Sequence, residues 1–187
     1  MSTPAQFEID VRNMLEEFNR ELPAINIRLS KSALSLLKNR IINDGENAKG
    51  NKMESYSDNE LPTWFFKGKG ISAGADAKLK EKIDKGEGVS YKDWRGMNGL
   101  QTNHRDLKFS GDMWRDIDVL QTIKTNEGVS TFVGAKNSIA RGENTTDKIM
   151  SYNAEQIGDF MNLTPEEESV LDKALDKDLQ TLIDKYL

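Results

Sequence analysis

The side chains that most often carry out catalysis are scarce in this sequence. It has a single histidine, His104, between Asn103 and Arg105, and no cysteine. Neither a second histidine nor a Gly-x-Ser-x-Gly turn accompanies it, so a nucleophile–base–acid triad lacks its parts. Ser110 precedes Gly111, but a serine beside a glycine is typical of a turn. We interpret His104 as a loop residue without a catalytic role, and we expect that the protein is not an enzyme.

Residues that could bind a metal or a phosphate do not have the required spacing. A cluster of oxygen-bearing side chains resembles a calcium loop: Asp44, Glu46, Asn47 and Asn51. An EF-hand requires glycine at its sixth position and an acid at its twelfth, where this chain has Lys49 and Ser55. The glycine pairs Gly68/Gly70 and Gly96/Gly99 do not follow a predicted strand, so a phosphate loop is not indicated. We expect that folding needs no metal and no organic cofactor.

The N-terminal segment predicts two helices. Thr3 and Pro4 suit an N-cap and a first helical position. The apolar residues that follow share one helical face: Phe7, Val11, Met14, Leu15, Phe18 and Leu22. Pro23 is expected to end this helix, and Ser30 to cap a second one that stops at Asp44-Gly45.

The C-terminal third predicts a hairpin followed by two helices. Apolar and polar residues alternate across residues 117–133, with a turn at 126–128, which is typical of a β-hairpin. A helix is expected from Thr145 to about Gly158. The last helix opens with Thr164-Pro165-Glu166-Glu167, which is the pattern of a capping box. We predict an α+β fold in which a small antiparallel sheet containing this hairpin is covered on one face by the helices carrying residues 7–22 and 171–186.

Residues 45–110 form the irregular part of the chain, with recurring glycines and one short predicted helix at 76–85. Irregular stretches of this length are uncommon in compact domains unless they are functional or disordered, and the aromatic content argues against permanent disorder. We predict that the aromatic residues are assembly contacts outside the core of the monomer: Tyr56, Trp64, Phe65, Phe66, Tyr91 and Trp94. The alternative is that these rings fold back under a long loop as a satellite cluster.

Composition favours one structural domain over residues 1–187, with 45–110 as an extended assembly region. The chain has 187 residues and is 36% hydrophobic, and two independent cores would be difficult to bury. The net charge of −5 argues against general nucleic-acid binding. The charged N-terminus lacks a signal-peptide pattern, and no apolar run approaches the roughly 18 residues of a membrane span. We therefore expect a soluble protein with no membrane partner.

Charge is distributed unevenly along the chain. Residues 67–108 contain ten basic and six acidic residues, whereas residues 155–187 contain three basic and nine acidic residues. An ordinary solvated surface accounts for this equally well. The functional interpretation is that an acidic edge of one copy meets a basic edge of the next, as in head-to-tail contacts that close into rings.

The order of these features carries a family resemblance. Two helices precede Tyr56-Ser57; next come residues 91–95 (YKDWR), Gly99-Leu100 and residues 106–113 (DLKFSGDM); a hairpin and residues 160–164 (FMNLT) follow. This succession resembles the tail-completion, or neck, proteins of tailed bacteriophages, to which the virion-morphogenesis proteins of Mu-like phages are similar. The stretch between Pro62 and Ser90 is longer than in that family, and residues 135–144 lack its small apolar run.

The resemblance implies a structural virion protein of the head-to-tail connector, made in the host cytoplasm. Its partners would be further copies of itself in a ring, the portal or adaptor protein, and tail proteins. DNA would pass through the ring without sequence-specific binding, and an acidic chain suits such a conduit. Two other classes remain open. One is a non-enzymatic adaptor or host-interaction module, and the other is a small hydrolase using a carboxylate pair such as Glu46/Glu54.

Overall fold

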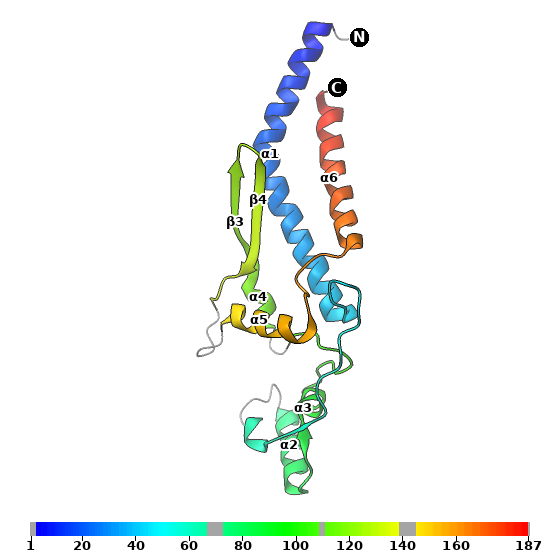
Figure 1. Ribbon diagram of the computed structural model, residues 1–187, viewed down its shortest axis with the longest axis vertical. Helices are drawn as coiled ribbons and strands as arrows, with labels where there is room; N and C mark the ends of the chain where they lie inside the picture. The colour runs from blue at the N-terminus through cyan, green and yellow to red at the C-terminus, as the bar shows by residue number, and fades with distance from the viewer. Residues whose placement is uncertain (1–2, 67–72, 109–110, 139–144, 187) are drawn as a thin grey trace.

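The computed structural model describes residues 3–66, 73–108, 111–138 and 145–186. Four residues singled out in the sequence, Gly68, Gly70, Phe109 and Ser110, lie outside these ranges. The molecule is elongated, with helix α1 running along most of its length and a small lobe at the opposite end from the N-terminus (Figure 1). The fold mixes helices with two small antiparallel sheets, so the predicted α+β class is confirmed.

One long helix, α1 (Pro4–Asn39), replaces the two helices expected at the N-terminus. Thr3 caps it as predicted, accepting a hydrogen bond from the Gln6 amide at 3.2 Å. The expectation that Pro23 ends the helix is wrong. Proline at this position removes the N–H that would bind the carbonyl of Asn19. Lys124 of the hairpin supplies a substitute donor, with its Nζ 2.5 Å from the Asn19 oxygen.

The hairpin consists of β3 (Ile117–Thr125) and β4 (Gly128–Ala135), joined by a two-residue turn. The register pairs Ile117 with Ala135 and Thr125 with Gly128, and a bulge interrupts it between Val119 and Gln121. The predicted hairpin is thus confirmed. It forms a two-stranded sheet by itself, and no other strand among the described residues joins that sheet.

Helix α1 packs against both strands of the hairpin, whereas α6 (Pro165–Tyr186) packs along α1. Figure 1 shows the hairpin and α6 on opposite sides of α1. The expectation that both terminal helices cover the hairpin is therefore wrong for α6. Ile117 is buried and Val119 half-buried, but Val133 remains 38% exposed. We call this arrangement of residues 4–33, 118–134 and 168–186 the shaft.

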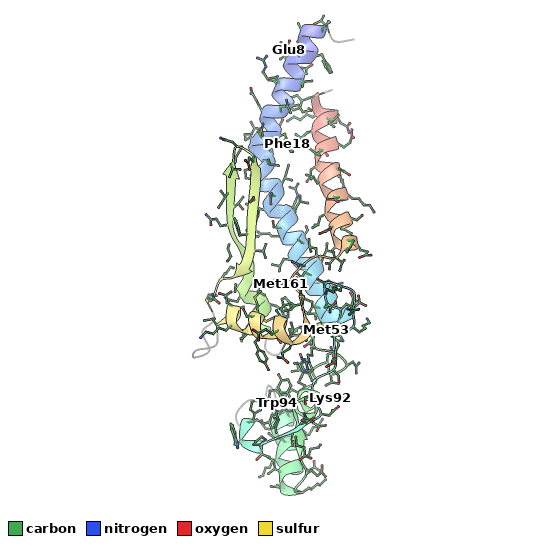
Figure 2. All side chains as sticks on the ribbon, in the orientation of Figure 1. Glu8, Phe18, Met53, Lys92, Trp94 and Met161 are labelled. Atoms are coloured by element: carbon green, nitrogen blue, oxygen red, sulfur yellow. The ribbon has the colours of Figure 1, made fainter. Side chains whose placement is uncertain are left out.

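The main core lies where α1 ends in the π-helical turn η1 (Arg40–Asp44). Helices α4 (Asp112–Asp116) and α5 (Thr146–Ile157) lie beside it, and Figure 2 shows Met53 and Met161 in this region. Its buried apolar residues form one cluster: Leu34, Leu37, Ile41, Met53, Met113, Trp114, Ile117 and Phe160. Buried Arg40 joins the end of α1 to the segment where α6 begins, because its Nε lies 2.9 Å from Glu167 Oε1 and its Nη2 2.7 Å from the Asn162 carbonyl.

The predicted capping box of the last helix is confirmed. The Thr164 amide donates to Glu167 Oε2 at 2.9 Å, and the Glu167 amide donates to Thr164 Oγ1 at 3.2 Å. Each residue thereby satisfies a backbone N–H of the other at the helix start, where intrahelical partners are missing. This reciprocal pair, together with the Arg40 contact, fixes the point from which α6 runs back along α1.

The segment expected to be a loop folds into a small lobe. It contains β1 (Glu60–Leu61), the 3₁₀ turn η2 (Thr63–Phe65), α2 (Ala73–Asp84), β2 (Val89–Ser90) and α3 (Tyr91–Met97). Strands β1 and β2 pair antiparallel, and the predicted short helix at 76–85 is confirmed as α2. A second buried cluster holds the lobe together: Phe66, Leu79, Val89 and Trp94. The expectation of a single core is therefore wrong.

Candidate assembly surfaces

The six aromatic residues predicted as assembly contacts do come together, as one continuous row of rings. Neighbouring ring centroids lie 5.2–6.5 Å apart in the order Trp64, Phe65, Phe66, Trp94, Tyr91, Tyr56. Such separations suit edge-to-face and tilted contacts between aromatic rings. Sequence reasoning thus grouped residues that lie together, although they come from η2 and the residue after it, from α3, and from the segment without regular secondary structure before β1.

Burial assigns most of this row to the interior of the lobe. Phe66 is fully buried and Trp94 is 2% exposed, so the expectation that they lie outside the core of the monomer is wrong. Tyr56, Phe65 and Tyr91 are half-buried. The alternative of a satellite cluster describes these rings better. Only the far end of the row, Trp64, is open to solvent, at 74% exposure, and it remains a candidate contact.

The other end of the row is anchored by a buried ion pair. Arg95 Nη2 lies 2.8 Å from Asp106 Oδ1, and Arg95 also donates to the carbonyls of Gln101 and Lys108. The Tyr56 hydroxyl donates to the same carboxylate oxygen at 2.8 Å, and the guanidinium carbon of Arg95 lies 4.1 Å from the Tyr56 ring centroid.

Burial, followed by the neighbouring Asp106 charge, raises the pKa of the Tyr56 hydroxyl far above its ordinary range. Tyr56 therefore stays protonated and keeps its hydrogen bond to Asp106. In addition, the Arg105 amide donates to the Glu54 carbonyl at 3.0 Å. This network ties the lobe to the two chain segments that connect it to the rest of the molecule.

Burial also changes the interpretation of the charged edges. Arg95 and Asp106 were counted in the basic segment, and Glu167 in the acidic one, yet all three are buried and paired. Lys67 and Lys69 lie outside the described residues. The buried Arg95–Asp106 pair removes one charge of each sign, so it leaves the excess of positive charge in this segment unchanged. Glu167 is paired with Arg40, which lies outside the acidic segment, so its burial removes one negative charge from that edge.

The residues considered for chemistry serve local structure. His104 is half-buried; its Nε2 lies 3.1 Å from the Ile42 carbonyl, and its ring lies over Gly45. A Cβ at position 45 would lie 2.3 Å from His104 Cγ, and φ there is +65°, so glycine is required. Asn47 Oδ1 accepts from the amides of Lys49 and Asn51, so in the cluster that was considered and set aside as a calcium loop this oxygen closes a local turn.

The Glu46/Glu54 pair considered for a hydrolase lies in the segment that follows η1. Glu46 forms an ion pair with Lys52 at 2.9 Å, and Glu54 is exposed. Within the described ranges, no three histidine or carboxylate side chains gather as a metal site would require. No helix in those ranges combines the length and the apolar character needed to cross a bilayer.

A surface that sequence reasoning missed lies on the outer face of the hairpin. Phe132 is 53% exposed and Ile123 37% exposed, and their paired positions place both on the face turned away from α1. Leu120, 50% exposed, lies over Gly134, where a Cβ would come 3.0 Å from its Cδ1. The signal was present in the alternation of β4, where Phe132 occupies the position expected for a polar residue.

Comparisons with protein-family models, with curated proteins and with solved structures find no match for this chain. Its function is therefore argued from the fold and surfaces described above.

Proposed function

We propose that this protein is a structural subunit that works by being built into a larger assembly of identical chains. The observation that carries the proposal is its accessible surface of 11,962 Å². A compact folded protein of 21.1 kDa exposes about 9,000 Å² by the usual scaling of surface with mass. The excess, on the order of a few thousand Å², is in the range that obligate interfaces between subunits bury.

The distribution of burial supports the same proposal. Across the shaft, Ile25 is the one residue classed as buried, although helix and strand run through nearly its whole length. Large apolar side chains remain open on all four of its elements: Phe7, Ile9, Leu15, Leu120, Ile123, Phe132, Val133, Val170 and Ile183. Apolar residues spread over several faces in this way favour contacts with more than one neighbour.

The particular assembly that we propose is the ring of the head-to-tail connector of a tailed bacteriophage. Two observations support it beside the resemblance in the order of sequence features. The hairpin and α6 flank α1 on opposite sides (Figure 1), which is the arrangement that a subunit contacting a neighbour on each side needs. The net charge of −5 is compatible with a conduit from which DNA phosphates are repelled. Portal or adaptor and tail proteins would bind the ends of the ring.

The experiment that tests the proposal is a measurement of mass and shape across a range of protein concentrations. Analytical ultracentrifugation and native mass spectrometry of the purified chain should give a closed oligomer of defined copy number, and negative-stain images should show rings. A chain that stays monomeric at high concentration would contradict the proposal. A monomer that binds a host protein with one-to-one stoichiometry would instead support the adaptor alternative, and a monomer with hydrolytic activity would support the enzyme.

A further inference from the structure

A groove of about 530 Å³ opens where the C-terminal half of α1 meets α4 and the start of β3. Its floor is apolar, because Leu34, Trp114 and Ile117 of the main core line it. Its rim is positively charged. The basic side chains in and beside it are Lys31, Lys38, Lys108, Arg115 and Lys136, and the acidic ones are Asp112 and Asp118.

Both acidic residues of this groove are already paired. Asp118 binds Lys136 at 2.6 Å, and Asp112 binds Arg115. Lys38 donates from its Nζ to a backbone carbonyl at 2.6 Å. Five basic side chains against two acidic ones leave three positive charges in excess, on a chain whose net charge is −5. Because apolar walls strengthen electrostatic attraction, the groove favours an occupant that carries several carboxylates.

Helix α6 carries a row of carboxylates that matches the groove in number and length. Glu168, Asp172 and Asp176 are spaced four residues apart, which aligns them along one edge of the helix, and all three are exposed. The row is about 12 Å long, and the stretch of α1 from Lys31 to Lys38 is about 10 Å long. The row therefore supplies one negative charge for each positive charge that the groove has in excess.

The groove and the acidic row lie at the same height along α1. Two ion pairs align the helices, Arg40 with Glu167 and Arg28 with Asp178. Residues 168–176 of α6 therefore run beside the stretch of α1 from about residue 30 to residue 39, which also lines the groove. The groove lies on the hairpin side of α1, and Figure 1 shows α6 on the opposite side.

We propose that the groove between α1 and α4 of one copy binds the acidic row of α6 of the next copy. This inference rests on the proposed function and names its head-to-tail contact. The contact is heterologous, since it joins two different surfaces of one chain, as closure into a ring requires. Rotation about an axis parallel to α1 keeps height unchanged, so surfaces at one height on opposite sides of the subunit can meet.

Charge reversal on either surface tests this contact. The groove variant carries Lys31→Glu and Lys108→Glu, and the row variant carries Asp172→Lys and Asp176→Lys. Each should raise the concentration for half-maximal assembly by about tenfold or more in analytical ultracentrifugation, because like charges then face each other. The four changes combined in one chain should restore assembly to within about threefold of the unchanged chain, because the charges are again complementary.

A matched control uses two other carboxylates of α6. Glu166→Lys with Asp184→Lys makes the same change in net charge, on a side of the helix turned away from the row. This control should shift assembly by less than about twofold, because exposed charges outside the contact contribute little. Thermal unfolding at a concentration where the chain is dissociated should give equal melting temperatures for all variants. A control as strong as the row variant would overturn the proposal.

The outcomes separate this inference from the proposed function. If the groove variant assembles like the unchanged chain, the contact is wrong while the ring stands. If the groove variant is weakened and the row variant is not, α6 is not the occupant and the proposal fails. If the unchanged chain binds a short DNA duplex and the groove variant loses only that binding, the groove holds phosphates and the proposal is overturned. An unchanged chain that stays monomeric contradicts both.

Discussion

The small lobe and the shaft differ in how completely each buries its own residues. The lobe is short, yet Phe66 and Val89 in it are fully buried and Trp94 nearly so. The shaft contains the longest helices and strands of the chain, and Ile25 alone among its described residues is buried. In this molecule, extensive regular secondary structure is therefore not accompanied by extensive burial of side chains. The lobe is stabilised by its own packing, whereas the shaft leaves large apolar side chains open to solvent.

The sharpest test of this contrast is to remove one aromatic ring from each region. Phe66→Ala leaves a cavity in the lobe and should destabilise it by about 3–5 kcal/mol. Phe132→Ala removes a ring from the exposed face of the hairpin and should change the stability of the free chain by less than about 0.5 kcal/mol. Hydrogen exchange of residues 60–97 and thermal unfolding would measure both changes. Trp64→Ala is the control within the lobe, and a loss as large as that of Phe66→Ala would contradict the burial pattern.

The ion pairs of the lobe provide a second test, which distinguishes buried from exposed charge. Arg95→Ala leaves the Asp106 carboxylate buried without its cationic partner, which should cost about 3–4 kcal/mol. Lys92→Ala removes an exposed pair with Asp58, where 74% of the aspartate side chain is accessible, and should cost less than about 1 kcal/mol. Urea denaturation monitored by tryptophan fluorescence would compare the two variants. Similar losses would mean that burial does not set the strength of these pairs.

The smallest expected effect concerns the shaft and depends on pH. Hydrogen bonds from Lys185 and Tyr186 lower the pKa of Glu17 below its ordinary value. A lowered pKa in the folded chain means that the contact contributes fully above about pH 4.3, the ordinary value for glutamate, and is lost as pH falls through the lower folded value. In acid the amide hydrogens at the end of α6 should therefore lose protection, measured against the intrinsic exchange rate at the same pH. Glu17→Gln should show the faster exchange at neutral pH, and no difference there would contradict this role of the carboxylate.

Local sequence determined the ends of the elements because the groups that fix them are neighbours in the chain. The Thr3 cap, the reciprocal pair of Thr164 and Glu167, and the hairpin turn each depend on residues a few positions apart. The choice of six aromatic residues was also possible from composition and spacing, since large rings stand out in a glycine-rich segment that is otherwise mostly polar. The sequence does not show which residues these rings pack against.

Tertiary structure alone decided the remaining features. Pro23 should have ended a helix, but a lysine about a hundred residues away binds the carbonyl that the proline leaves without a partner, and α1 continues. From the sequence, Arg95 would be taken for one more surface charge. In the structure it is paired with Asp106, to which Tyr56 also donates a hydrogen bond. Whether a residue is buried depends on segments that are distant in the chain, and local pattern does not encode their position. For that reason the sequence determined the helix caps, the hairpin and the last two helices, whereas the structure decided that α1 is continuous, that the lobe folds and which faces are left open to solvent.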